Sequence, residues 1–491
     1  MKRGFLNVSK AKARPLGPAL GTVRLRSWAA RLSGGLAAAT AVNPSPVIAP
    51  GTKVEKLPIG KRNVEVPEGY SQPMRYVERD ARAGSVPNAM TFTTLPVGAR
   101  EDEPVTECFF YPGSKEVVMN LPGFPKPLVH PATPAFHLSS TPGKGLGLFS
   151  TRALKQGDHI LSERPLLVTV RCVPVSYPPS FTRDQYYQHT LNEFEKCLEI
   201  PVKRMRPEDR EAFMALENSH KEDGSGPIVG IVRTNGLCLK GLLPDVKDEN
   251  SEFQYAAICK DISRLNHSCS PNTMPRFDML SFSYNLFAVR DIAKGEELTF
   301  LYTNITCSAA KRNEALKPYD FVCTCSACKD PAASDAARTK IGEFGAPPVY
   351  MWLFNHELPD DWILTECRER LASIVHEGLE AISEYPRTLT SAMEACIALG
   401  DALGASEWAA KLMKAKWDDS KERKALEAKL ELEALLDPAS LAYPAHPMWR
   451  KRVDSPYKDA RTSPLKMIKM MQEVEALANR DGVARPFVMM F

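Results

Sequence analysis

The feature that most constrains the fold is a run of three cysteines, Cys323, Cys325 and Cys328, with the spacing Cys-x-Cys-x2-Cys. The other cysteines of the chain are scattered, so this run is more typical of metal ligands in a reducing compartment than of a disulfide framework. Zinc in structural sites is tetrahedral and takes four ligands. The run therefore predicts a closed metal site whose fourth ligand comes from elsewhere, the alternative being three free cysteines in a loop.

Length and composition limit the class of protein. A chain of 491 residues is too long for one core and predicts two to four domains. Apolar residues make up 44% and charged residues 25%, as in soluble globular proteins. The net charge of +4, from 63 basic and 59 acidic residues, gives no argument for nucleic-acid binding. No apolar run approaches the length of a membrane span. The scattered cysteines lead us to expect an intracellular protein with mostly reduced thiols.

The first 54 residues differ from the rest in charge. They hold nine Lys or Arg and no Asp or Glu, with many Ser and Ala. Mitochondrial transit peptides have this composition, and so do disordered basic tails that contact acidic partners or direct a protein to the nucleus. The several prolines of residues 1–54 favour the tail. Residues 55–134 are rich in proline and have little periodicity, which predicts an extended connector.

Periodicity then separates strands from helices. Short strands are predicted at 135–138, 146–150, 159–163, 166–170, 253–259, 282–290 and 298–302. Residues 182–221 predict a helical insert between the two groups of strands. After Pro331 apolar residues recur at helical spacing, which predicts helices at 362–382, 388–402, 405–435 and 463–479. The chain is therefore predicted to be α+β with an all-helical C-terminal part.

Three motifs precede or accompany the cysteine run in a fixed order. They are Gly143-Lys144-Gly145-Leu146-Gly147-Leu148, Asn266-His267-Ser268-Cys269, and Gly295-Glu296-Glu297-Leu298-Thr299-Phe300-Leu301-Tyr302. Together with the cysteines they resemble the core and post-SET region of SET-domain protein lysine methyltransferases. The layout is most similar to the SET-and-MYND group and to fungal SET proteins without the MYND zinc finger, because residues 172–252 contain no Cys-x2-Cys pairs with histidines.

The sequence disfavours a dinucleotide-binding site at these glycines. Gly143, Gly145 and Gly147 have the first part of the spacing, but Ser150 stands where the last glycine belongs, and no long helix follows. A second alternative pairs Cys269 with His267 as nucleophile and base, since side chains two apart in an extended segment share a face. No third group that would orient the histidine is evident in the sequence.

The resemblance implies specific roles for the motif residues. It implies S-adenosylmethionine as cofactor, contacted by Lys144, Gly145, Leu146, Gly147, Asn235, Asn266, His267, Tyr302 and Phe321. Tyr302 and Tyr319 would be catalytic, and with Phe321 would wall the channel for the acceptor lysine. Cys269 would complete the zinc site with Cys323, Cys325 and Cys328. For Asn235, an ordinary turn asparagine before glycine is an equally good account.

The domain boundaries follow from these assignments. We expect a basic tail at 1–54, the connector at 55–134, a SET domain at 135–305 with its helical insert at about 174–252, a post-SET zinc region at 306–330 and a helical domain at 331–491. The SET fold implies small twisted β-sheets and a pseudoknot made by the Asn266 segment. The C-terminal helices resemble the tetratricopeptide-like extension of the SET-and-MYND group, although no clean repeat is present.

The resemblance implies transfer of a methyl group from S-adenosylmethionine to a lysine of a histone or another protein. The alternative is an inactive SET-fold protein that binds peptides or assembles complexes, and the C-terminal helices could hold a protein partner in either case. Nucleus, cytoplasm or both are the expected compartments, with the mitochondrion as the alternative from the basic N-terminus.

Overall fold

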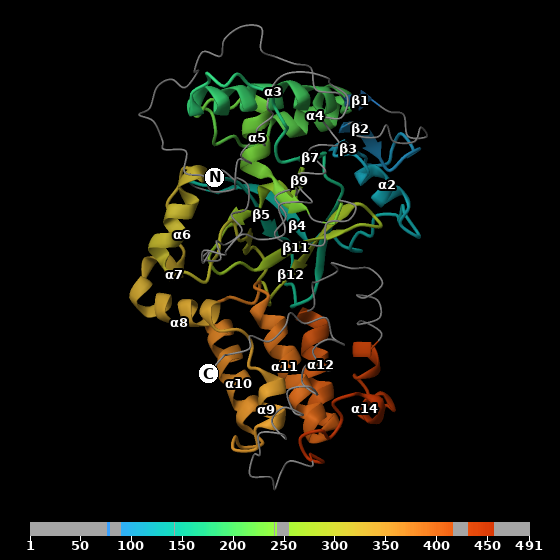
Figure 1. Cartoon of the computed structure of the whole chain (residues 1–491), viewed down its shortest axis with the longest axis vertical. Helices are drawn as coiled ribbons and strands as arrows, with labels where there is room; N and C mark the ends of the chain where they lie inside the picture. Colours follow the sequence, from blue (N-terminus) through green and yellow to red (C-terminus); the bar gives the residue numbers. More distant parts are fainter. Residues whose placement is uncertain are drawn as a thin grey trace. The chain divides into compact units, whose positions relative to one another are not determined.

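The computed structural model describes residues 76–78, 90–141, 143–239, 241–242, 255–415 and 431–455. The chain divides into two compact units, Met1–Asp335 and Ala336–Phe491 (Figure 1). The first unit contains β-sheets with helices around them, and the second is helical where it is described. The predicted α+β class with a helical C-terminal part is confirmed. The predicted tail at 1–54 and helix at 463–479 lie outside the described residues.

The largest sheet of the first unit contains strands that the sequence analysis did not anticipate. Its spatial order is β1 (Tyr76–Glu78), β2 (Met90–Leu95), β3 (Thr106–Phe110), β7 (Leu167–Val170), β9 (Tyr255–Ile258) and β8 (Leu237–Leu239). β2, β3 and helix α2 (Ser114–Met119) lie in the region assigned to the proline-rich connector. Every residue of β3 is buried, and Phe109 stacks on Phe92 with ring centroids 4.4 Å apart. These short apolar segments belong to the domain because β3 pairs in parallel with β7, which is distant in sequence.

Two smaller sheets carry the sequence motifs. One has the order β10 (Asn266–His267), β13 (Glu297–Phe300), β5 (Gly145–Ser150) and β4 (Phe136–Thr141). The other has the order β11 (Thr273–Asp278), β12 (Ser283–Ala288) and β6 (His159–Glu163). β10 precedes the β11–β12 hairpin and β13 follows it, yet β10 and β13 pair in parallel. This return of the chain to its own earlier segment is the predicted pseudoknot.

The insert between β7 and β8 consists of α3 (Arg183–Arg204), α4 (Pro207–Met214) and α5 (Pro227–Asn235). The carboxylate of Glu195, on α3, accepts the backbone N–H groups of Ile228 at 2.9 Å and Val229 at 2.7 Å. It thereby caps α5, where unpaired N–H groups and the helix dipole favour an anion. Because α5 ends at Asn235, a predicted cofactor residue, the cap fixes the position of one part of the candidate site.

Replacing Glu195 with alanine should destabilise the protein by about 1–3 kcal/mol, because two part-buried N–H groups lose a charged acceptor. The readout is the midpoint of urea unfolding. Glu199→Ala is the matched control on the same helix, since its exposed pair with Lys203 at 2.8 Å should contribute less than about 0.5 kcal/mol. Equal shifts for the two variants would contradict the capping role.

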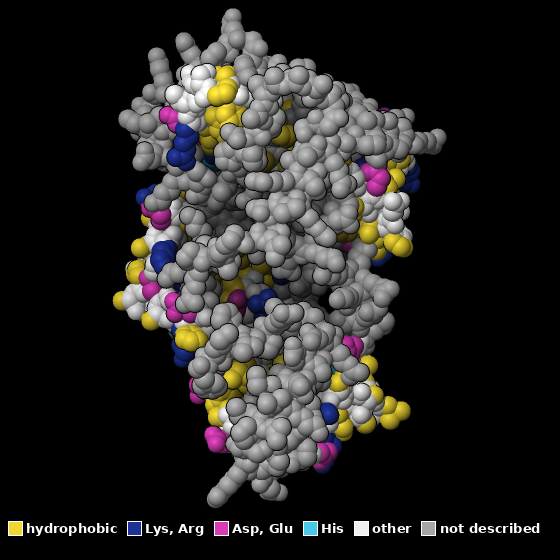
Figure 2. Space-filling model, viewed as in Figure 1, with side chains coloured by type: hydrophobic (Ala, Val, Ile, Leu, Met, Phe, Trp, Pro, Cys, Tyr) yellow, Lys and Arg dark blue, Asp and Glu magenta, His cyan; other side chains and the backbone are white. Residues whose placement is uncertain are grey.

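Short helices connect the sheets to the second unit. They are α6 (Ala309–Leu316), the 3-10 turn η2 (Lys317–Tyr319), α7 (Ser326–Lys329) and α8 (Pro331–Glu343). A separate 3-10 turn, η1 (Ile262–Arg264), precedes β10. Basic and acidic side chains intermingle along the edge formed by α6 and α7 on the face seen in Figure 2. The division between the units falls inside α8, close to the predicted boundary at 331.

The second unit is built from α9 (Val349–Phe354), α10 (Trp362–His376), α11 (Glu384–Leu399), α12 (Ala402–Ala415) and α14 (Ala442–Ala445). Buried arginines with ion-pair partners hold its loops. Arg452 pairs with Asp360 at 2.8 Å and lies over the Trp352 ring at 4.8 Å from its centroid, and Arg338 pairs with Glu377 at 2.9 Å. None of the described helices combines the length and apolar character that a membrane span requires.

Candidate active site and metal centre

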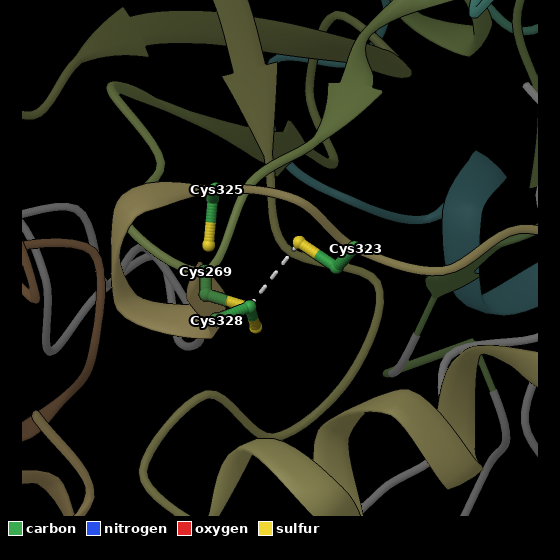
Figure 3. Close-up of side chains that lie close together, drawn as sticks. All are labelled: Cys269, Cys323, Cys325 and Cys328. Carbon is green, nitrogen blue, oxygen red and sulfur yellow. Dashed lines mark hydrogen bonds between the residues drawn. The ribbon is translucent and has the colours of Figure 1, made fainter. Parts of the chain in front are cut away.

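The four predicted metal ligands meet in one cluster (Figure 3). Cys323 and Cys325 precede α7, Cys328 lies on it, and Cys269 follows β10. The four sulfur atoms lie within 4.8 Å of one another, and that of Cys269 is 3.8 Å from Cys323 and 3.5 Å from Cys328. Zn–S bonds of about 2.3 Å in a tetrahedron would place sulfur atoms about 3.8 Å apart. The donor set and its spacing therefore fit a tetrahedral zinc ion.

Helix α6 supports the cluster, a contribution that the sequence analysis missed. The fully buried guanidinium of Arg312 donates to the Cys328 sulfur at 3.5 Å, and Asn313 accepts the backbone N–H of Cys323 at 3.0 Å. The hydrogen bond with Cys269, and more weakly the Arg312 guanidinium, lower the pKa of the Cys328 thiol to about 6 against the opposing effect of burial. A cation at this position offsets part of the negative charge of clustered thiolates.

Cys325→Ala should reduce the zinc content of the purified protein from about one equivalent, because three thiolates cannot complete a tetrahedral shell. Zinc retained after dialysis against a chelator is the measurement. Cys197→Ala, on α3 and away from the cluster, is the matched cysteine control and should retain zinc like the unchanged protein. Equal retention by Cys325→Ala and Cys197→Ala would contradict the assignment of this ligand.

The glycine-rich turn between β4 and β5 is held to the pseudoknot by Glu297. Its carboxylate accepts the Asn266 amide at 2.7 Å and pairs with Lys144 at 3.3 Å. The Asn266 amide also donates to the Leu146 carbonyl oxygen at 3.3 Å. A Cβ atom on Gly147 would lie 2.9 Å from both the Asn266 amide nitrogen and the Glu297 carboxylate, so a side chain there would displace these two groups. Glu297, which had no predicted role, thus links two predicted cofactor residues, Lys144 and Asn266.

His267 uses both ring nitrogens within the protein. Nδ1 accepts the backbone N–H of Tyr302 at 3.1 Å, and Nε2 lies 3.3 Å from the Cys269 sulfur. Burial lowers the pKa of His267 to about 3, so the imidazole is neutral. Cys269 is completely buried and shares its sulfur with the other thiols, so it is no exposed nucleophile. The burial of Cys269 and its place in the four-sulfur cluster disfavour the alternative of a Cys–His nucleophilic pair.

Tyr302, Tyr319 and Phe321 form one aromatic group. The ring centroid of Tyr302 lies 4.9 Å from that of Tyr319 and 6.5 Å from that of Phe321. Both tyrosines are buried and Phe321 is half-buried. The Tyr302 hydroxyl donates to the Leu265 carbonyl oxygen at 2.6 Å. The arrangement combines apolar ring faces with a hydroxyl oxygen, which suits an aliphatic chain that ends in a polar group.

The predicted cofactor residues divide between two cavities. A cavity of about 360 Å³ is lined by Gly145, Leu146, Asn235 and Asn266, together with Thr141 and, from the insert, Ala215 and Glu217. A cavity of about 240 Å³ is lined by Lys144, His267 and Phe321, together with Cys323 and Cys325. The two cavities adjoin, because residues that are consecutive in the chain line different cavities. Lys144 and His267 line the smaller cavity, and Gly145 and Asn266 line the larger one. Gly147 and Tyr302 line neither.

Asn235 is the last residue of α5, rather than part of a free turn. Its side-chain NH2 group donates to the carbonyl oxygens of Glu217 at 2.7 Å and Ile231 at 2.8 Å, which leaves its Oδ1 as an acceptor. In the lining of the same cavity, the buried Thr141 hydroxyl has no hydrogen-bond partner among the described residues. The Asn235 Oδ1 acceptor and the Thr141 hydroxyl are groups that could hydrogen-bond to a polar ligand in this cavity.

Asn272 holds the pseudoknot closed and was also missed. Its Oδ1 accepts the backbone N–H of Thr299 at 2.7 Å, and its Nδ2 donates to the Glu297 carbonyl oxygen at 2.8 Å. The side chain thus pairs with β13 as another strand would. The sequence signal for this role was its position in the loop that follows Cys269, directly after a proline. An asparagine at such a position commonly bonds to backbone.

Comparison with known proteins agrees with this geometry. The SET domain family matches residues 145–303. The chain is 28% identical over 293 residues to the protein named histone-lysine N-methyltransferase set5 of Schizosaccharomyces pombe. The aligned region covers 58% of this chain and 78% of the relative. It is 34% identical over 160 residues to human histone-lysine N-methyltransferase SMYD3, covering 31% of this chain and 36% of the relative. Human N-lysine methyltransferase SMYD2 is 31% identical over 106 residues, 21% of this chain and 23% of the relative.

Residues 145–303 thus match the SET domain family, as the sequence motifs predicted. Over the matched segments the chain is similar to the set5 and SMYD proteins.

Proposed function

We propose that this protein transfers a methyl group from S-adenosylmethionine to the side-chain amine of a lysine in another protein. The observation that carries the proposal is the convergence, on the pseudoknot, of Asn266, the buried Tyr302 hydroxyl and the aromatic pair Tyr319 and Phe321. The names of the related proteins support the same reaction.

Lysine methylation requires a neutral amine. With a reference pKa of about 10.4, roughly one lysine in a few thousand is neutral at pH 7. An aromatic wall that excludes water favours proton loss, because burial disfavours the charged form. The Tyr302 hydroxyl donates a hydrogen bond to the Leu265 carbonyl oxygen, so its oxygen is oriented to accept a hydrogen bond from the amine. The rings hold the alkyl chain in line for transfer, an orientation effect worth several kcal/mol.

The larger cavity is the proposed site of S-adenosylmethionine, which when bound supplies an activated methyl group on a sulfonium. Gly145 and Leu146 offer backbone that a flat ligand can approach, and the Oδ1 atoms of Asn235 and Asn266 suit amino groups of the cofactor. The Thr141 hydroxyl would gain the partner that it lacks. Lys144 and Phe321, in the adjoining cavity, would contact the same ligand from the other side.

The four-cysteine cluster is the proposed site of a structural zinc ion, since all four positions of a tetrahedron are filled by protein thiols. The acceptor is proposed to be a histone or another protein, in the nucleus, the cytoplasm or both. The mitochondrial alternative rested on residues 1–54, which lie outside the described residues. The helical second unit is proposed to hold a protein partner.

Gly147→Ala should weaken binding of S-adenosylhomocysteine at least about tenfold, because the added methyl group displaces Asn266 and Glu297. Calorimetric titration measures the change without knowledge of the acceptor. Gly345→Ala is the matched control, since a Cβ there meets nothing within 4 Å, and it should leave the affinity unchanged. Unchanged affinity in Gly147→Ala would argue against this cavity, and no binding by the folded, zinc-loaded wild-type protein would sink the enzyme assignment.

Tyr302→Phe should lower methyl transfer about 10²-fold or more while S-adenosylhomocysteine affinity stays within about threefold, because the hydroxyl acts on the acceptor amine. The assay follows tritiated methyl groups into purified core histones and into a protein extract. Tyr284→Phe is the matched control: its buried hydroxyl also donates to a backbone carbonyl, that of Cys238 at 3.0 Å, and its loss should leave transfer intact.

Equal transfer by Tyr302→Phe and Tyr284→Phe would contradict the role of Tyr302. Cofactor binding without transfer to any protein would favour the alternative function, a SET-fold module that binds peptides or assembles complexes.

A further inference from the structure

The imidazole of His267 lies between the cysteine cluster and the proposed catalytic tyrosine. Its ring is 4% exposed, and its two nitrogens contact the backbone N–H of Tyr302 and the sulfur of Cys269. The sequence resemblance implies that His267 binds the cofactor. With both ring nitrogens engaged by the protein, the side chain has no hydrogen-bonding atom left for that task.

The tautomer of His267 follows from its partners. A backbone N–H can only donate, so Nδ1 must accept from Tyr302. The proton of a neutral imidazole then sits on Nε2, which donates to the Cys269 sulfur. The Cys269 sulfur also contacts the sulfur atoms of Cys323 and Cys328, so its position depends on the other members of the cluster. An ion bound by all four sulfur atoms would fix the atom that Nε2 contacts, and the ring is therefore held most firmly when the cluster carries its metal.

Tyr302 depends on this segment because the sheet ends before it. β13 stops at Phe300, and the last backbone bond to the neighbouring segment runs from the Ser268 N–H to the Phe300 carbonyl oxygen at 3.1 Å. Beyond that point the Tyr302 N–H is bonded to His267 and the Tyr302 hydroxyl to the Leu265 carbonyl oxygen. Both ends of Tyr302 are thus attached to the three residues 265–267.

We infer that His267 is a positioning residue that transmits the metal state of the four-cysteine cluster to Tyr302. This inference rests on the proposed function for its catalytic consequence, but the coupling itself is a property of the fold. Metal loss would release the Cys269 sulfur from its fixed position beside Nε2, and the ring would no longer fix the Tyr302 backbone. The cluster would then control the alignment of the acceptor lysine as well as the fold of the post-SET segment.

Two isosteric variants in the full chain separate the two contacts. In His267→Asn the side-chain oxygen can take the position of Nδ1, so the Tyr302 contact is kept and the Cys269 contact is lost. In His267→Gln the amide reaches the position of Nε2, so the Cys269 contact is kept and the Tyr302 contact is lost. The readouts are zinc retained against a chelator and hydrogen exchange of the Tyr302 backbone amide.

His267→Asn should lower zinc affinity about tenfold or more, the usual effect of losing a bond to a metal ligand, with the Tyr302 amide still protected. His267→Gln should keep its zinc affinity within about threefold and exchange the Tyr302 amide about tenfold faster. In the unchanged protein, zinc removal should accelerate exchange at Tyr302 about tenfold and leave Val168, in the central strand β7, unchanged. In His267→Asn, zinc removal should no longer affect Tyr302.

Identical behaviour of the two variants in both readouts would overturn the inference. Unchanged Tyr302 exchange in wild-type protein that has lost zinc and remains folded would overturn it too, and this arm stands if the variants do not fold. Neither readout uses methyl transfer. An inactive protein that shows the coupling would therefore refute the proposed function alone, whereas an active protein without it would refute the inference alone.

Discussion

The parallel pairing of β10 with β13 is the interaction on which the candidate site depends. Only two residue pairs form it, Asn266 with Thr299 and His267 with Phe300. So short a ladder is weak by itself, and the Asn272 side chain extends it by bonding to the backbone of β13. The cofactor cavity, the aromatic group and the cysteine cluster all contain residues of these two segments or lie directly beside them.

Much of the fold could be predicted because its signals are local. Strand pattern predicted β5, β6, β12 and β13, and cysteine spacing predicted three of the four members of the cluster. The strands at 90–110 were missed because β3 joins the sheet by pairing with β7, about sixty residues away, and β2 joins it by pairing with β3. A short apolar run rich in neighbouring prolines carries no local sign of a distant partner.

The sequence predicted which residues meet at the candidate site more successfully than it predicted what each of them does there. Family motifs identified Asn266, His267 and Tyr302, but hydrogen bonds decide what each side chain does. His267 is occupied on both nitrogens, and Arg312 supports the cluster from a helix outside every motif. Such roles depend on tertiary geometry, which residue spacing does not encode.

The cap on α5 has a consequence for how this protein can change in evolution. Only the end of that helix reaches the cavity, and its start is fixed by a single carboxylate, Glu195. A Cβ at Gly226 would lie 2.3 Å from the same carboxylate, so a side chain at that position would displace the cap. Substitution of Glu195 or Gly226 would therefore reach the cavity from the opposite end of α5 by displacing Asn235, and changes around Glu217 would do the same, because its carbonyl oxygen accepts the Asn235 side chain.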